Sequence, residues 1–302
     1  MTDKNKKGIG YYLLYGVFSL AAMLPFRVLY FISDVLYVLV YKIVGYRKKV
    51  VKKNIHNSFP DKNSKELLAI EKEFYRHFCD YFVETIKTLR ITDEEIRERM
   101  VFENLEIVEQ LTRDGNSCLM SLGHCGNWEW VPSIILHLPS QIKLGMVYKR
   151  LSSKDFDDFF LRLRSRFGPR AIEMKSIYRT IVQNRNEGVT MLIGFLNDQR
   201  PRPSANEFWL KFLNQDTVVQ TGMERIAAQM GFAVTYLDIK KVKRGFYKCT
   251  VSAITADASK EDEHVVSEIY TRKLEQTIIE NPAYYLWTHN KWSRCKPDNV
   301  YI

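Results

Sequence analysis

From residue 101 onward, short β-rich segments alternate with amphipathic helical patterns, and this alternation limits the possible folds more than any other feature. It predicts an α/β domain with a mostly parallel sheet flanked by helices, because each helix carries the chain back to where the next strand begins. The predicted strands are Ser117–Leu122, Ile142–Tyr148, Val189–Leu196, Phe232–Ile239 and Phe246–Ala253. The predicted helices are Leu105–Arg113, Trp128–Leu138, Lys154–Phe167, Ile177–Asn186, Val219–Met230 and Glu261–Glu280.

The amino-terminal part of the chain predicts a hydrophobic helical membrane anchor. Gly8 to Phe26 is a run of 19 residues without charge, and a helix of that length is about as long as a bilayer core is thick. A second apolar stretch, Val28 to Val44, contains Asp34 and is expected to be a shallow or protein-packed helix. The alternative is a hydrophobic helix pair that covers the domain. The sequence leaves open whether residues 8–26 cross the bilayer or lie in its interface.

Positive charge is concentrated at the same end. Residues 1–60 hold ten Lys and Arg against two acids, so they carry +8 of the formal net charge of +10. Residues 47–53, with the sequence RKKVVKK, form a basic collar suited to an anionic membrane surface. A nucleic-acid binder would instead spread its basic residues over the folded domain, so no nucleic-acid partner is expected. The positive-inside tendency places the collar and the following domain on the cytoplasmic side.

The chain is expected to have two parts. Residues 1–53 form the anchor and the basic collar, and residues 54–302 form one catalytic domain, with a helical lead-in at 61–100 and an α/β core at 101–302. Signatures of other enzyme classes are missing: the sequence has no G-x-S-x-G, no G-x-x-x-x-G-K-[ST], no G-x-G-x-x-G after a strand and no H-E-x-x-H. The five cysteines have no zinc spacing, so no metal site is expected.

The strongest candidate for catalysis follows the predicted strand Ser117–Leu122. His124 and Glu129 stand five positions apart in a loop that contains Gly123 and Gly126 and leads into a helix. In an open α/β sheet, ligands bind at the carboxyl ends of the strands. There Glu129 could contact one ring nitrogen of His124 and leave the other free to act as a base.

Charged residues follow two other predicted strands. Lys149 and Arg150 come after Ile142–Tyr148, and Asp198 and Arg200 come after Val189–Leu196. The guanidinium of Arg200 could bind a phosphate, and Asp198 could orient the basic groups.

Four ordered blocks resemble the bacterial lipid A biosynthesis acyltransferases, the secondary lauroyl or myristoyl transferases, in their Bacteroidetes-type branch. The blocks are Gly123–Glu129, Val147–Arg150, Asn197–Pro201 and the ending Asn281–His289. The resemblance implies a glycerolipid-acyltransferase-like fold and an enzyme that moves an acyl group from an acyl carrier protein or coenzyme A thioester to a hydroxyl of a lipid A precursor or related glycolipid. No other cofactor is implied.

The same resemblance implies that His124 is the general base and that Glu129 supports it. Tyr148 of the second block is expected to bind substrate together with Lys149, Arg150, Asp198 and Arg200. It also implies the bacterial inner membrane as the location, with acyl carrier protein as a partner. Trp287 and His289 match the family's ending, but no role follows for them. The alternatives are a non-catalytic lipid- or carrier-binding membrane protein, a thioesterase, and an acyltransferase acting on a phosphatidylinositol mannoside-type glycolipid.

Overall fold

A computed structural model describes residues 7–204 and 206–296. It contains a seven-stranded sheet in the order β1-β9-β8-β2-β5-β3-β4, in which every neighbouring pair is parallel except the β8–β9 hairpin. The predicted α/β class with a mostly parallel sheet is therefore confirmed. The strands are β1 (Met100–Glu103), β2 (Cys118–Leu122), β3 (Lys143–Tyr148), β4 (Arg170–Glu173), β5 (Met191–Leu196), β8 (Ala233–Lys243) and β9 (Phe246–Thr255).

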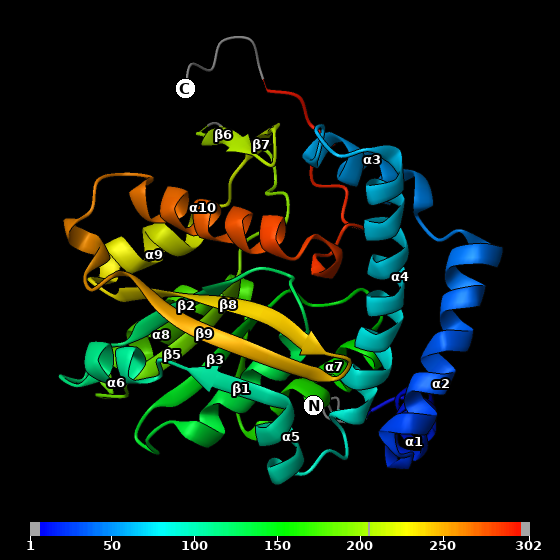
Figure 1. Cartoon of the computed structure of the whole chain (residues 1–302). Coiled ribbons are helices and arrows are strands. Elements are labelled where there is room, and N and C mark those ends of the chain that lie inside the picture. The colour runs from blue at the N-terminus through cyan, green and yellow to red at the C-terminus, as the bar shows by residue number, and fades with distance from the viewer. Residues whose placement is uncertain (1–6, 205, 297–302) are drawn as a thin grey trace.

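Helices cover both faces of this sheet (Figure 1). One face packs against α5 (Asp93–Arg99), α6 (Glu106–Thr112) and the 3₁₀ segment η2 (Trp128–His137). The other packs against α8 (Ile177–Asn186), α9 (Gly222–Met230) and α10 (Val265–Glu280). The central strand β2 is buried along its whole length. Two apolar layers, one on each side of the sheet, thus hold β2 in the core.

Several elements differ from the sequence prediction. The edge strands β1 and β4 and a separate hairpin of β6 (Trp209–Phe212) and β7 (Gln215–Val218) were not predicted, because four residues carry too little period-two signal. Residues 128–137 form 3₁₀ turns and not an amphipathic α-helix. Pro132 lies inside this segment, where it has no backbone N–H to donate to the preceding turn. The predicted helix Lys154–Phe167 divides into α7 (Lys154–Arg164) and the 3₁₀ turn η3 (Ser165–Phe167).

The amino-terminal segment folds against the domain and does not project from it. It comprises α1 (Ile9–Met23), α2 (Phe26–Tyr37), the π-helical segment η1 (Val38–Val44), α3 (Lys48–Ser58) and the long α4 (Ser64–Lys87). Elsewhere in the chain, short 3₁₀ turns form η4 (Met174–Ser176), η5 (Ala258–Lys260) and η6 (Pro282–Tyr284). In the described part of the chain, no single helix is long and apolar enough to cross a membrane. The pair Ile9–Met23 and Phe26–Val44 meets that test only together, with a bend of 118° between its members.

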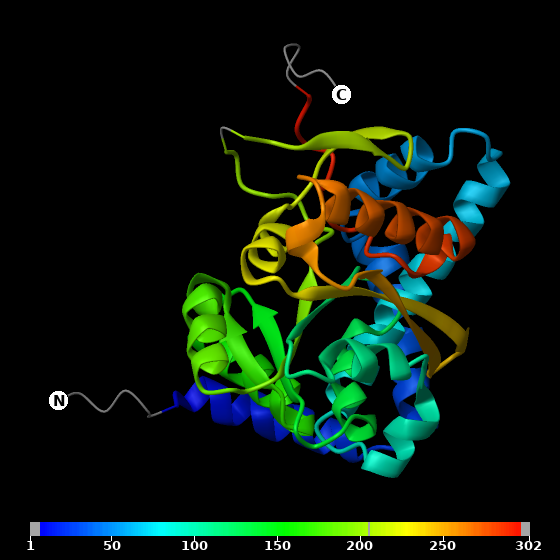
Figure 2. The same ribbon diagram turned by 90° about the vertical axis from the view of Figure 1, so that its left-hand side faces the viewer.

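Hydrogen bonds tie one face of α1 to the domain. Nζ of Lys87, at the end of α4, donates to the carbonyls of Ala22 and Leu24 at 3.1 and 3.0 Å. The Arg90 guanidinium donates to Ser19 Oγ at 2.8 Å. The helix therefore lies along the surface of the domain (Figure 2), in contact with α4 and α7.

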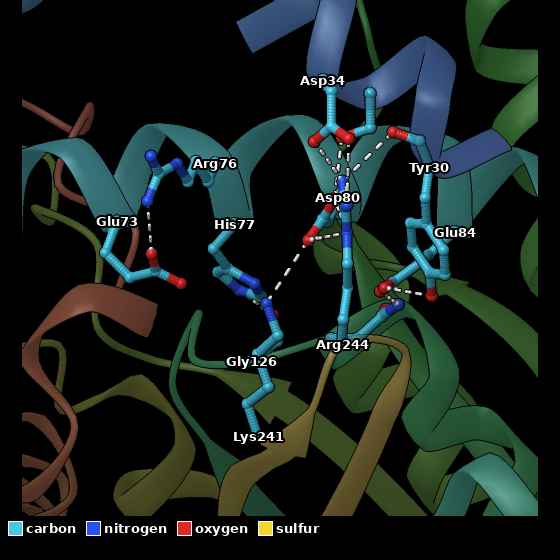
Figure 3. Close-up of polar contacts among 12 residues, drawn as sticks. Tyr30, Asp34, Glu73, Arg76, His77, Asp80, Glu84, Gly126, Lys241 and Arg244 are labelled. Atoms are coloured by element: carbon cyan, nitrogen blue, oxygen red, sulfur yellow. Dashed lines mark hydrogen bonds and ion pairs between the residues drawn. The ribbon is translucent and has the colours of Figure 1, made fainter. Parts of the chain in front are cut away.

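An ion pair explains how the charge of Asp34 is tolerated in the second apolar helix. Its carboxylate pairs with Arg244, in the turn of the β8–β9 hairpin, at 2.7 Å, and the same guanidinium reaches the buried Asp80 of α4 at 2.6 Å (Figure 3). Ser33 Oγ also donates to Asp80, at 2.7 Å. The helix pair thus covers the domain, as the alternative interpretation of the sequence expected, while its membrane role stays a prediction.

Candidate active site

The loop after β2 carries His124 at the carboxyl edge of the sheet, between β5 and β8. Its two glycines lie close against neighbouring side chains. A Cβ on Gly123 would collide with the Leu274 side chain of α10. Gly126 has φ +56°, and a Cβ there would come within 2.8 Å of Ile239 Cγ2. The loop therefore runs close against α10 and β8, which leaves its path little freedom.

Asp198, just after β5, is the carboxylate that contacts His124. Its Oδ1 lies 2.6 Å from His124 Nδ1, and its Oδ2 accepts from the His124 backbone N–H at 3.0 Å. The side chain of Asp198 is only 2% exposed. Burial alone would raise its pKa, but the charge and hydrogen bonds of His124 lower that pKa to about 2. An anionic Asp198 makes Nδ1 the protonated nitrogen and leaves Nε2 as the basic one.

Nε2 of His124 is the ring nitrogen that does not contact Asp198, and the imidazole side chain is 12% exposed. Gln199 Nε2 lies 3.3 Å from this nitrogen. The indole of Trp128 stands edge-on to the imidazole, with ring centroids 5.0 Å apart, and Tyr81 stacks on that indole at 4.2 Å. Trp128 and Tyr81 also line a small pocket together with Phe74, His77, Phe78, Tyr284, Tyr285 and Leu286.

Glu129 does not contact His124, which corrects the expected partner of the imidazole. Its buried carboxylate binds Arg164 of α7, which donates to it from Nη2 at 2.5 Å and from Nε at 2.9 Å. The 3₁₀ turns that begin at Trp128 direct this side chain toward α7, whereas the sequence spacing could not specify a direction. Glu129 thus joins the His124 loop to α7, and Arg164 is a site residue that the sequence reasoning missed.

The other predicted site residues do not gather at His124. Tyr148 ends β3 and is partly buried, while Lys149 is exposed. Arg150 pairs with Glu173 of β4 at 3.2 Å and lies 3.9 Å from Asp157 of α7. These three residues border the carboxyl end of β3, two strands from the imidazole.

Arg200 lies closer, because it stands only two positions after Asp198 in the chain. Its guanidinium contacts Ser293 Oγ, and its backbone N–H donates to His289 Nε2 at 3.1 Å. The expectation that Asp198 orients basic groups is replaced by its contact with the imidazole.

A buried carboxyl supports the His124 loop from α4. Asn127 Nδ2 donates to Glu84 Oε2 at 2.8 Å, and the hydroxyl of Tyr247 donates to the same oxygen at 2.7 Å. The hydroxyl of Tyr30 donates to the other carboxylate oxygen at 3.0 Å (Figure 3). Burial raises the pKa of Glu84 to about 7. His77 Nε2 lies 3.1 Å from the Gly126 carbonyl. The loop is thereby held by polar groups of α4 that have no sequence motif.

Cys125, beside the base, is unsuited to act as a nucleophile. The thiol is 4% exposed, and burial raises its pKa well above the usual value, so it stays protonated. In the described residues, no group of three His, Cys, Asp or Glu side chains could hold a metal ion. The site therefore offers one base, a buried anion behind it and aromatic walls, which suits deprotonation of an acceptor hydroxyl.

A family model described as bacterial lipid A biosynthesis acyltransferase matches residues 4–294 of the chain. No curated protein sequence matches at a significant level.

Proposed function

The chain belongs to the bacterial lipid A biosynthesis acyltransferase family and is an acyltransferase with a lipid A precursor as acceptor; from this premise we propose that it works by His124 general-base catalysis at the membrane. The observation that carries the proposal is the His124–Asp198 pair, 2.6 Å apart, at the carboxyl ends of two adjacent parallel strands. The donor is a fatty acyl thioester of acyl carrier protein or coenzyme A.

His124 Nε2 takes the proton of the acceptor hydroxyl while the hydroxyl oxygen attacks the thioester carbonyl. The resulting tetrahedral intermediate collapses to the ester, and the departing thiolate takes the proton back from Nε2. Asp198 keeps the proton on Nδ1 and stabilises the imidazolium formed between these two steps. No acyl-enzyme is formed, which agrees with the protonated thiol of Cys125.

An assay of acyl transfer tests the proposal directly. Purified full-length protein is given labelled acyl thioester and a lipid A precursor with a free acyl-chain hydroxyl, and the glycolipid is analysed by mass spectrometry. We expect its mass to increase by one acyl chain. Release of free fatty acid without any transfer would indicate a thioesterase, and transfer only to a phosphatidylinositol mannoside would contradict the proposed acceptor. Acyl carrier protein and coenzyme A thioesters are assayed in parallel to identify the donor.

The outward face of α1 supports a membrane location. Leu13, Val17 and Leu20 lie one turn apart on this face and are 65%, 63% and 69% exposed. Since hydrogen bonds hold the opposite face to the domain, α1 would lie in the plane of the interface and would not span the bilayer. The exposed Lys49, Lys52 and Lys53 of α3 add charge for anionic lipid. We place the protein on the cytoplasmic side of the inner membrane.

We expect the double substitution Leu13→Glu and Leu20→Glu to weaken binding to anionic vesicles by roughly tenfold or more, because each buried leucine contributes about 1.5–3 kcal/mol. Binding is measured by co-sedimentation at low and high salt. Ile279→Glu, at a 51% exposed position on α10, is the matched control and should bind normally. Undiminished binding of the double variant would refute the assignment of this face. Deleting the helices is a poorer test, because α2 buries Leu29 and Tyr37 in the core.

A further inference from the structure

A segment near the carboxyl terminus contacts both loops that carry the candidate catalytic pair. We call residues 284–291 the C-terminal strap. On the side of the His124 loop, the backbone N–H of Leu286 donates to the His124 carbonyl at 3.0 Å, and Gly126 N–H donates to the Tyr284 carbonyl at 2.9 Å. The strap therefore pairs with the backbone of the loop on either side of Cys125, directly after His124.

The far end of the strap reaches the Asp198 loop. Lys291 Nζ donates to the Asp198 carbonyl at 2.6 Å, and His289 Nε2 accepts from the Arg200 N–H at 3.1 Å. Burial lowers the pKa of His289 to about 4, so the ring is neutral and can accept. One short segment thus fixes the backbone on both sides of the 2.6 Å contact between His124 and Asp198.

Lys291 of the strap is unusual for a lysine because its amine is buried. The residue is 7% exposed, and Nζ lies beside Asp198 and 5.4 Å from the ring centroid of Phe212 on β6. Burial lowers the pKa of this amine to about 8, and the Asp198 charge opposes that shift. Burying an ammonium group costs free energy unless hydrogen bonds and an opposite charge offset it. Here both come from Asp198.

The middle of the strap is anchored on α3. Asn54 Nδ2 donates to the carbonyls of Trp287 and His289, both at 2.9 Å, and Arg47 Nη1 donates to the Thr288 carbonyl at 2.9 Å. Trp287 is fully buried and donates from Nε1 to the Pro282 carbonyl at 2.6 Å. These contacts fix the strap to the domain. The strap can therefore hold the His124 and Asp198 loops in place.

We propose that the C-terminal strap positions the catalytic pair and that Lys291 is the positioning residue through which it holds Asp198, and thereby the His124 imidazole, in place. This inference rests on the proposed function. The inference also gives a role to Trp287 and His289, for which the sequence suggested none. Trp287 secures the strap, and His289 and Lys291 hold the Asp198 loop. Lys291 acts only through Asp198, at the backbone carbonyl and by its charge, and takes no part in proton transfer.

The test compares Lys291→Met, which removes charge and donor, with Lys291→Arg, which keeps both. Lys240→Met is the matched control, because Lys240 is a partly exposed lysine that pairs with Glu280, away from the His124–Asp198 pair. All are assayed as full-length protein at equal folded amounts, with kcat, KM for the thioester and the pH–rate profile as readouts. We expect Lys291→Met to lower kcat by about 10–100-fold with KM nearly unchanged, since small misplacement of a catalytic group has effects of this order.

The pH–rate profile separates positioning from general loss of structure. Among the described residues, the charged groups near the His124–Asp198 pair are Lys291 and Arg200. The other titratable groups that interact with Asp198 are His289, Cys125, Tyr236, Tyr270 and Tyr285, and burial keeps all five neutral by lowering the pKa of His289 and raising the pKa of the thiol and the phenols. Removing the Lys291 charge makes protonation of the pair easier, so the acid limb of the profile should move to higher pH in Lys291→Met. It should stay in place in Lys291→Arg and in Lys240→Met.

Normal kcat and an unmoved acid limb in Lys291→Met would overturn the inference. A loss that merely follows the folded fraction would do so as well. If Lys291→Met does not fold, Asn54→Ala tests the strap from α3 and should lower kcat without changing KM; unchanged kcat in that variant would overturn the inference. Because His124→Ala tests the base separately, a dead His124 variant beside a normal Lys291→Met would reject the strap's role and leave the proposed function standing.

Discussion

Replacing His124 by alanine should lower acyl transfer by about 10²–10⁴-fold, the usual effect of removing a positioned general base. An acceptor hydroxyl is a poor nucleophile at neutral pH and needs a base. Among the described residues, His124 is the only histidine whose ring contacts the Asp198 carboxylate. The fold should persist, because the backbone contacts of residue 124 with Asp198 and Leu286 do not need the side chain. Transfer of labelled acyl groups into glycolipid measures the loss.

Two variants control for this result. His56→Ala removes an exposed histidine of α3 and should leave transfer unchanged. Cys125→Ser should also be tolerated, because direct transfer needs no thiol nucleophile. An inactive Cys125→Ser beside an active His124→Ala would point to an acyl-cysteine intermediate and refute the mechanism. Normal transfer by both variants would locate the active site elsewhere.

Asp198→Asn should be nearly as damaging as loss of the base, with kcat lowered by about 10³–10⁴-fold, as when the anion behind a catalytic histidine is removed in comparable sites. An amide N–H facing Nδ1 would turn that nitrogen into an acceptor and move the ring proton to Nε2, where the base is needed. Even in the correct orientation, an amide could not stabilise the imidazolium. The folded state should be retained, since asparagine is nearly isosteric with aspartate. kcat at equal folded protein is the measurement.

Glu129→Gln provides the contrast, because its carboxylate binds Arg164 and not the imidazole. We expect a loss of about 1–3 kcal/mol in the free energy of unfolding, as a hydrogen-bonded partner of a partly buried charge becomes neutral, and a smaller fall in kcat than in Asp198→Asn. Arg164→Lys should resemble it in stability, since it keeps the charge but loses the two-pronged geometry. A larger kcat loss in Glu129→Gln than in Asp198→Asn would restore Glu129 as the supporting carboxylate.

The amino-terminal helical segment shows where sequence and structure each contribute. The uncharged run Gly8–Phe26 and the polar interruption at Asp34 were visible in the sequence. Nothing in the sequence showed that Asp34 would pair with Arg244, which lies 210 positions away in a hairpin turn. That contact explains how the charge is accommodated. With a bend of 118° between them, the two apolar stretches form helices that pack on the domain.

The sequence by itself predicted the inner strands of the sheet, the loop after β2 and a candidate base in that loop. Alternating strand and helix patterns predicted β2 and β5 to within two residues at each end, and the glycines around His124 marked a tight turn at a strand's carboxyl end. Such features are local, because strand periodicity and backbone conformation depend on neighbouring residues. The partner of His124 was decided only by tertiary structure. Parallel strands align residues that are distant in the chain, so Asp198, 74 positions away, reaches the imidazole, while Glu129, only five away, faces α7 because the intervening 3₁₀ turn directs it there.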